Sequence, residues 1–250
     1  YGIGTLVLAL IFHKRLLRIT RREAMSGIII GLFLFAGYAL QTTGIQSTTV
    51  SKAGFITGMY IPLVPLFSFL FLRQRPTLKA IVGVAFSVVG LCLLSINNSF
   101  NLVFGVGEAL ILGCALAFAM HIVMISKFAP SADPINLAIV QLTLTSVLSC
   151  LAIPIAREPL IIPSLPVWGA VLFMGVVDVA FTLSAMNWVQ QYVSGTRATL
   201  VYALEPMWAA LTGYLIAGDI LSLPAWIGCG FILLGMIVGV MRLPRIAWLK

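Results

Sequence analysis

Charged residues are scarce in this chain of 250 residues. Asp, Glu, Lys and Arg together make up 9% of it, and only seven residues are acidic, whereas a soluble domain carries about 25% charged residues. Hydrophobic residues reach 61%, against roughly 45–50% in a soluble domain. Because so little of the chain can face water, the composition excludes an ordinary soluble protein and predicts an all-α polytopic membrane protein.

Catalytic and metal-binding motifs are also lacking. The chain has two histidines, His13 and His121, and contains no HExxH, no GxSxG and no aspartate-rich pair, so the common hydrolase and zinc-site patterns are missing. Its four cysteines lie in apolar stretches without the paired spacing of a metal site or disulfide. We therefore expect no cofactor, no metal and no enzyme, although a polytopic intramembrane enzyme and a non-transport membrane subunit remain the alternative interpretations.

Long apolar runs, in contrast, fill the chain. Eight of them approach the roughly 20 residues that a helix needs to cross a bilayer: 24–44, 50–72, 78–96, 105–126, 135–156, 166–187, 196–217 and 222–241. Residues 1–12 are apolar but too short to span, and we interpret them as part of a further span whose beginning is missing. The connections are short and polar, which predicts a single bundle of helices.

The basic residues are distributed unequally between alternate connections. Thirteen of the 15 fall on one side: Lys14, Arg15, Arg18, Arg21, Arg22, Arg73, Arg75, Lys79, Lys127, Arg197, Arg242, Arg245 and Lys250. Only Lys52 and Arg157 fall on the other. The positive-inside rule places the richer side, and with it the C-terminus, in the cytoplasm. Topology thus explains the net charge of +8, and we expect no nucleic-acid partner.

The two halves of the chain resemble each other. A shift of 144 residues, which becomes 145 after a one-residue gap between Pro62 and Leu78, aligns similar residues in corresponding spans. The aligned pairs include Gly31 and Gly175, Gln46 and Gln190, Pro62 and Pro206, Gly83 and Gly228, Phe86 and Phe231, and Gly90 and Gly235. Because an odd number of spans separates the copies, the repeat predicts two inverted five-helix halves. A ten-helix protein follows, with its first helix and part of the second missing from this chain.

Three stretches, 47–95, 105–127 and 193–239, resemble the EamA-like branch of the drug/metabolite transporter superfamily. The most specific piece is the Glu-Pro pair in LVYALEPMWAALTGYLIAGD (200–219), which ends at Asp219 and precedes a glycine-rich helix. The resemblance implies a first repeat at 1–97 with helices 2 to 5, a second repeat at 104–242 with helices 6 to 10, and a cytoplasmic tail at 243–250. It also implies transport of small metabolites, often amino acids.

Two carboxylates, Glu205 and Asp178, lie near the middle of spans. An ionised side chain at the bilayer centre costs roughly 2.5–3.5 kcal/mol, so each needs a reason to be there. Glu205 either meets a cationic group or a proton in a cavity, or bonds the backbone opened by Pro206. Asp178, whose repeat partner is Leu34, is interpreted either as specific to the cargo or coupling ion or as paired with a buried polar neighbour. His121 is a candidate for proton relay or for hydrogen-bonded packing.

Polar side chains at helical spacing indicate helix faces that line a central cavity or, for any single face, form hydrogen bonds between helices. These faces carry Tyr38, Gln41 and Thr42; Thr57 and Tyr60; Gln141, Thr145 and Ser149; and Thr199, Tyr202 and Glu205. Pro62, Pro65 and Pro206 interrupt corresponding helices and are the predicted helix-break or gating positions.

The sequence therefore predicts a secondary transporter, more an exporter than an importer, that moves a small metabolite such as an amino acid or a related compound by alternating access. No ATP-binding motif is present, so proton coupling or facilitated exchange is expected, with Glu205 and Asp178 as the titratable groups. The expected partners are a small-molecule substrate and lipid, with protons and a second copy of the chain left open. The expected location is the bacterial inner (plasma) membrane.

Overall fold

The computed structural model describes residues 1–95, 105–156, 164–217 and 222–240, and within these ranges all regular structure is helical. Seven helical segments of the described chain are long and apolar enough to cross a membrane: Arg21–Ile45, Lys52–Leu72, Leu78–Ser95, Val106–Ser131, Pro134–Pro154, Leu165–Val189 and Leu223–Val240. They correspond to seven of the eight predicted spans. The eighth, 196–217, is also helical but is divided into shorter pieces.

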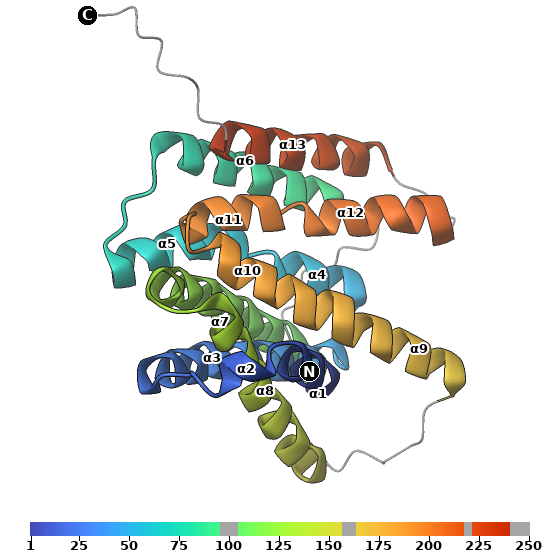
Figure 1. The fold of residues 1–250 in the computed structure, drawn as a ribbon. Coiled ribbons are helices and arrows are strands. Elements are labelled where there is room, and N and C mark those ends of the chain that lie inside the picture. Colours follow the sequence, from blue (N-terminus) through green and yellow to red (C-terminus); the bar gives the residue numbers. More distant parts are fainter. Residues whose placement is uncertain (96–104, 157–163, 218–221, 241–250) are drawn as a thin grey trace, which may run out of the picture.

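The described part of the first half of the chain contains six helices, labelled in Figure 1. They are α1 (Gly2–Ile11), α2 (His13–Leu16), α3 (Arg21–Ile45), α4 (Val50–Thr57), α5 (Tyr60–Leu72) and α6 (Leu78–Ser95). α3 begins with a capping box: the Glu23 amide donates to Thr20 Oγ1 (3.2 Å), and the Thr20 amide donates to the Glu23 carboxylate (2.9 Å). These bonds satisfy two backbone groups that a helix start would otherwise leave free.

The second half is built in a similar way. Its elements are α7 (Val106–Phe128), η1 (Ala129–Ser131), α8 (Pro134–Ala156), α9 (Leu165–Phe173), η2 (Met174–Thr182), α10 (Leu183–Val189), α11 (Gly195–Tyr202), α12 (Glu205–Thr212), η3 (Gly213–Ala217) and α13 (Leu223–Val240). η2 is a π-helix that joins α9 to α10 in one continuous span. The predicted tail, 243–250, and Asp219 lie outside the described residues.

Two spans are broken by a short turn, and the two turns are alike. One lies at Gly58 and Met59, between α4 and α5, and the other at Ala203 and Leu204, between α11 and α12. Pro206 cannot donate a backbone hydrogen bond, and its ring excludes the carbonyl four residues earlier. A new helix therefore starts at Glu205, with the proline in its first turn, where no donor is needed.

The prolines of the first half behave differently from one another. Pro62 lies in the first turn of α5, as Pro206 does in α12, whereas Pro65 lies inside α5, beyond the break. Ile61 donates its amide to the Gly58 carbonyl at 3.0 Å, which tightens the turn ahead of Pro62.

Element boundaries place the one-residue gap of the repeat earlier than the sequence alignment did. Gln46 follows α3 and Gln190 follows α10, a shift of 144, but Thr49 and Ser194 precede α4 and α11 at a shift of 145. The gap therefore falls in the turn before α4 and α11. At a shift of 145, Pro206 corresponds to Ile61, one residue before Pro62.

Helices α6 and α13 pack against each other as an antiparallel pair at one edge of the molecule (Figure 1). A Cβ built on Gly83 would lie 2.6 Å from the carbonyl oxygen of Gly235, and a Cβ on Gly235 would lie 2.6 Å from that of Gly83. The same distance separates Gly90 and Gly228 in both directions. Glycine is needed at these four positions because the two backbones touch.

The contacts between α6 and α13 are symmetric in the numbering of the repeat. A shift of 145 turns Gly83 into Gly228 and Gly90 into Gly235, so the two glycine contacts are exchanged by it. Between them, the rings of Phe86 and Phe231 lie 5.7 Å apart, and these two residues are also related by 145. Each of these contacts between α6 and α13 thus has a counterpart at a shift of 145.

α7 runs through the centre of the bundle, where it packs against α3, α4 and α5. It is the most buried of the seven spans. Outward-facing helix surfaces carry large exposed apolar side chains, such as Phe71, Leu151 and Phe173. Such surfaces are expected of helices whose solvent is lipid.

Candidate functional site

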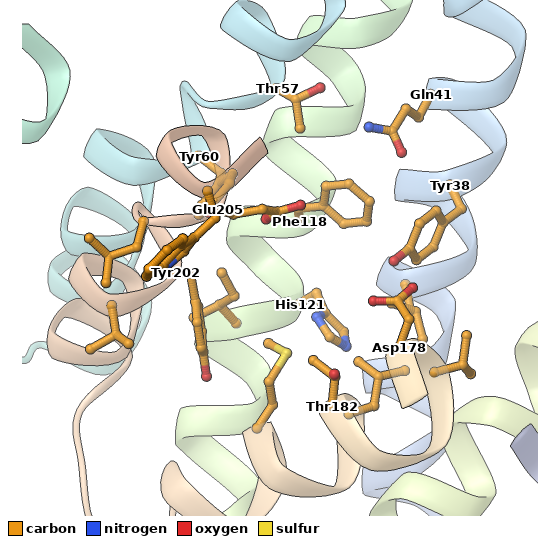
Figure 2. A pocket seen from close by; sticks show the side chains of 18 residues that line it. Tyr38, Gln41, Thr57, Tyr60, Phe118, His121, Asp178, Thr182, Tyr202 and Glu205 are labelled. Carbon is orange, nitrogen blue, oxygen red and sulfur yellow. The ribbon is translucent and has the colours of Figure 1, made fainter. Parts of the chain in front are cut away.

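A cavity of about 500 Å³ lies in the middle of the bundle, between helices of both halves (Figure 2). Its polar and aromatic lining consists of Tyr38, Gln41, Thr57, Tyr60, Phe118, His121, Asp178, Thr182, Tyr202, Trp208 and Glu205. Eight of the residues selected from the sequence are among them: Glu205, Asp178, Tyr38, Gln41, Thr57, Tyr60, Tyr202 and His121. Outside the lining lie Thr42, Gln141, Thr145, Ser149, Thr199, Pro62, Pro65 and Pro206.

Thr42 does not reach the cavity because of helix geometry. It follows Gln41 on α3, and successive side chains of an α-helix point about 100° apart. Gln41 lines the cavity, whereas Thr42 is exposed on the outside of the bundle. The placement of Thr42 among the cavity residues is therefore wrong.

The break between α11 and α12 positions Glu205. It is the first residue of α12, so its carboxylate lies at a helix N-terminus, where free backbone amides favour negative charge. In Figure 2 its side chain extends toward Phe118 on the central helix α7. The turn thus places the Glu205 carboxylate beside free backbone amides, which stabilise its negative charge, and directs it into the cavity.

Asp178 lies on a different wall, within the π-helical η2. A π-helix has wider turns than an α-helix, and such insertions are frequent at functional sites. Figure 2 shows the Tyr38 hydroxyl directed toward the Asp178 carboxylate. The Tyr38 ring is held edge-on by Phe118, with ring centroids 5.0 Å apart.

Neither cavity carboxylate has a protein partner in the part of the chain that the structure describes. Both Asp178 and Glu205 are exposed, and no hydrogen bond or ion pair to a described residue involves either of them. The other described acids are all bonded: Glu108 to Lys52 and Thr48, and Glu23 and Asp133 within a polar network. The two cavity acids are therefore available to whatever enters.

His121 is placed differently from the two acids. Its side chain is 2% exposed, and its Nε2 lies 3.0 Å from Oε1 of the fully buried Gln141. One ring nitrogen is thus bonded to a neighbouring helix. The hydrogen-bonded packing role, one of the two considered from sequence, has direct geometric support.

The cavity lining follows the internal repeat. With a shift of 144 on α3 and of 145 from α4 onward, four pairs of lining residues correspond: Leu34 with Asp178, Tyr38 with Thr182, Thr57 with Tyr202, and Tyr60 with Glu205. Each of these pairs takes one residue from each half of the chain. The symmetry is broken chemically, because both acids come from the second half.

The sequence reading missed Thr182, Phe118 and Trp208. Thr182 is the repeat partner of Tyr38, so the repeat itself carried the signal. Phe118 precedes His121 by three residues, and Trp208 follows Glu205 by three, which places each on the same helix face as a selected residue. A search for polar residues alone passes over such aromatic neighbours.

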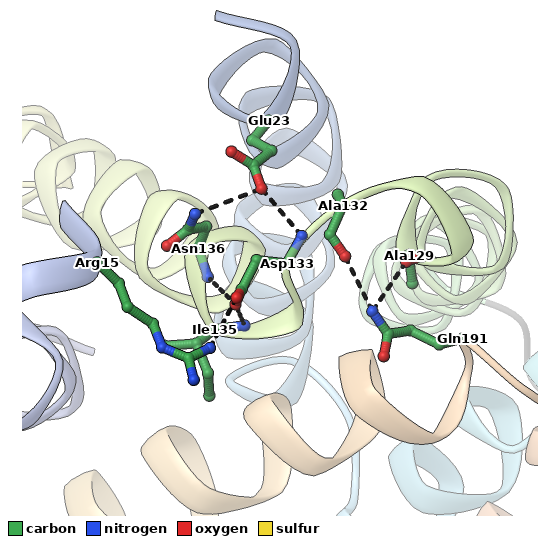
Figure 3. A network of polar contacts seen from close by, with 8 residues as sticks. All are labelled: Arg15, Glu23, Ala129, Ala132, Asp133, Ile135, Asn136 and Gln191. Carbon is green, nitrogen blue, oxygen red and sulfur yellow. Dashed lines mark hydrogen bonds and ion pairs between the residues drawn. The ribbon is translucent and has the colours of Figure 1, made fainter. Parts of the chain in front are cut away.

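A separate polar network joins the connections on the predicted cytoplasmic side (Figure 3). Arg15 Nη1 donates to Asp133 Oδ2 at 2.7 Å, and the Asp133 amide donates to Glu23 Oε1 at 2.9 Å. Asn136 also donates to Glu23 Oε1, at 3.3 Å, and Gln191 Nε2 donates to two carbonyls of the turn between α7 and α8. The network ties the start of α3 to the start of α8.

No group of three or more His, Cys, Asp or Glu side chains gathers as metal ligands would, within the residues that the structure describes. The cavity contains a single histidine and two acids that lie on separate walls.

Comparisons with known proteins agree with this architecture. A model of the EamA-like transporter family matches residues 1–96 and 105–241. An uncharacterized transporter of Archaeoglobus fulgidus is 30% identical over 216 residues, which cover 86% of this chain and 68% of the relative. The uncharacterized transporter YyaM of Bacillus subtilis is 23% identical over 239 residues, or 90% of this chain and 76% of the relative.

A solved crystal structure shares the fold, with a TM-score of 0.79, 20% sequence identity, and coverage of 94% of this chain and 83% of that chain. The long apolar helices, the extent of the family match and the 30% identity to a transporter lead to one conclusion. The chain is an integral membrane protein and belongs to the EamA-like transporter family.

Proposed function

We propose that this protein is a secondary transporter, built from two inverted halves, that carries a small metabolite through the central cavity by alternating access. The observation that carries the proposal is the cavity itself: equivalent positions of the two halves line it, and two carboxylates without described partners face it. Paired, interrupted helices near the bilayer midplane are a common design for such sites.

The inverted arrangement has support from three features. The breaks between α4 and α5 and between α11 and α12 occur at a shift of 145, α6 and α13 run antiparallel, and their glycine contacts exchange under the same shift. An inverted repeat of this kind allows one half to adopt the conformation of the other. Rocking between the two states would then open the cavity to each side in turn.

Proton coupling is the energy source that the cavity chemistry favours. Glu205 and Asp178 are the two carboxylates that face the cavity, and neither is held by a described cationic side chain. Cargo and proton would compete for the same carboxylates, which couples their movements. His121, bonded to Gln141, is less suited to carry a proton through the site.

The proposed location is the inner (plasma) membrane, with the C-terminus in the cytoplasm. The unequal distribution of Lys and Arg supports this orientation. Arg15, which contributes to the polar network with Asp133, and Lys127 are on the richer side, and Lys52 with its partner Glu108 is on the poorer side. Export is the proposed direction.

An intramembrane enzyme is disfavoured by the described cavity lining. Among the described residues, the lining includes no Ser or Cys, and the described hydrogen-bond partner of His121 is the amide of Gln141, not the hydroxyl of Thr57 or Thr182. A nucleophile with an adjacent base is the usual arrangement of a hydrolytic site.

Untargeted metabolite analysis of cells expressing the intact protein tests the proposed function. One or a few small metabolites should accumulate outside cells with the unmodified protein, and less so with Glu205→Gln or Asp178→Asn. The matched control is Glu108→Gln, which changes an acid outside the cavity. The proposal is wrong if no metabolite changes its distribution across the membrane in cells where the protein is present in the membrane at normal level.

A further inference from the structure

We propose that the cargo of the central cavity is an organic cation: a protonated or quaternary amine with an apolar body. This inference rests on the proposed transport function and specifies its substrate class. It differs from the amino-acid class expected from sequence, because it assigns the cargo a positive charge without a balancing carboxylate.

The charge of the cavity is the first argument. Asp178 and Glu205 face it from two walls, and no Lys or Arg is among the described residues that line it. Two described basic residues form ion pairs outside the cavity lining: Lys52 with Glu108 at 3.3 Å, and Arg15 with Asp133 at 2.7 Å. An anionic group in the cavity would be desolvated beside like charges without a partner, which is costly.

A zwitterion meets the same difficulty at one end. Its ammonium group could approach Asp178 or Glu205, but its carboxylate would need a donor of positive charge that the described lining does not supply. The two described helices that begin after a turn within a span each start with a residue that lines the cavity, α12 with Glu205 and α5 with Tyr60, and neither N-terminal turn carries a Lys or Arg side chain. A cation without a carboxylate pairs with the two acids and adds no further negative charge to the cavity.

Aromatic rings supply the second argument. Tyr38, Tyr60, Phe118, Tyr202 and Trp208 all line the cavity. The faces of such rings are electron-rich and attract ammonium groups, most strongly where water is excluded. Five rings around two carboxylates form an environment that stabilises positive charge and also packs against apolar groups.

Tyr60 is a third and separate observation. It is 8% exposed, it lines the cavity, and no hydrogen bond to a described residue satisfies its hydroxyl. The hydroxyl is not among the fully enclosed, unpaired side-chain oxygens of the described residues, so a molecule in the cavity can reach it. The Tyr60 oxygen can accept a hydrogen bond from an ammonium N–H, so an ammonium cation in the cavity would supply the hydroxyl with a hydrogen-bond partner.

The remaining lining explains the apolar body of the cargo. Leu34, Ile122, Val179, Leu183 and Met186 cover the cavity between the polar groups. Its volume of about 500 Å³ is within the range of small-molecule pockets, roughly 300–1,000 Å³. A bare inorganic cation would leave this apolar surface unfilled.

Three probes with the same phenyl ring and similar chains separate the charge classes: 2-phenylethylamine is a cation at pH 7, phenylalanine a zwitterion and 3-phenylpropionate an anion. Isothermal titration calorimetry on the full chain in lipid nanodiscs, with empty nanodiscs subtracted, measures the binding of each. The amine should bind at least about tenfold more tightly than the zwitterion, as expected for a charge-assisted contact. The anion should bind most weakly.

Variants identify the site of binding. Asp178→Asn and Glu205→Gln should each weaken amine binding about tenfold, whereas the matched changes Asp133→Asn and Glu108→Gln, which lie outside the cavity, should leave the ratio of amine to zwitterion affinity unchanged. The comparison of the three probes on the unmodified protein needs no variant, so a variant that fails to fold does not remove the test.

The proposal is overturned if phenylalanine or 3-phenylpropionate binds as tightly as the amine, or if none of the three binds at millimolar concentration. It is also overturned if the amine binds equally well to both cavity variants. If the proposed cargo class is wrong, the transport function is still tested separately by the metabolite analysis described above, because that analysis does not depend on the charge of the cargo.

Discussion

Replacing Gly90 by Ala should weaken the contact between α6 and α13. The new Cβ would lie 2.6 Å from the carbonyl oxygen of Gly228 and 2.8 Å from the backbone nitrogen of Ile232. Both neighbours are backbone atoms, so no side-chain rotation can relieve the contact. Since ordinary van der Waals contact begins at 3.4 Å, the helices must separate by about 0.8 Å.

The expected cost follows from this separation. Overpacking of this kind typically costs about 1–3 kcal/mol, and each kcal/mol lowers the melting temperature of a chain of this size by roughly 2–4 °C. Gly230 is the matched control, because it lies on α13 with nothing within 4 Å of an added Cβ. There the same change should be neutral or stabilising by up to about 1 kcal/mol, the usual preference for Ala over Gly in a helix.

Thermal denaturation in nanodiscs, followed by size-exclusion chromatography of the surviving fraction, measures both variants. Gly90→Ala should melt several degrees below the unmodified protein, and Gly230→Ala at or above it. Gly235→Ala should behave like Gly90→Ala, since the two positions are equivalent in the repeat. Equal melting temperatures for Gly90→Ala and Gly230→Ala would refute the close antiparallel packing of α6 and α13.

Two further pairs of variants test the polar network and the cavity lining. Glu23→Ala should lower the melting temperature more than Arg15→Ala. Glu23 is buried and its carboxylate accepts hydrogen bonds from Thr20, Asp133 and Asn136, whereas the Arg15 side chain is about half exposed and its ion pair is worth at most about 1 kcal/mol. Equal decreases in melting temperature for the two variants would contradict the bonding of Glu23. Gln41→Ala should reduce metabolite release and Thr42→Ala should not, because of these two neighbours only Gln41 lines the cavity. A larger loss of release for Thr42→Ala would mean that α3 presents a different face to the cavity.

The spans were predictable because each depends on a local property, a run of apolar residues. The helices α3, α6, α7 and α8 begin and end within a few residues of the predicted limits. The span at 196–217 was harder, since a proline marks a nearby break without fixing its exact turn. The interruption falls two and three residues before Pro206, because the new helix accommodates the proline in its first turn.

The cavity was predictable where residue type and spacing coincide. Mid-span acids are rare enough to stand out, and both Asp178 and Glu205 line the cavity. Thr42 was misplaced because a polar residue one step along a helix faces another direction. The bonds of Glu23 to Asp133 and Asn136 could not be foreseen, since they join residues more than a hundred positions apart and depend on how α3 and α8 pack.

Access to the cavity from both sides of the membrane tests the central claim most directly. Thr182→Cys, in a background whose four native cysteines are replaced, places a single thiol on the cavity wall. A membrane-impermeant maleimide is added to spheroplasts or to inside-out vesicles, and labelling is followed by mass spectrometry. Alternating access predicts labelling from both sides, with an excess of transported cargo reducing it; labelling from one side only, unaffected by cargo, would contradict the account.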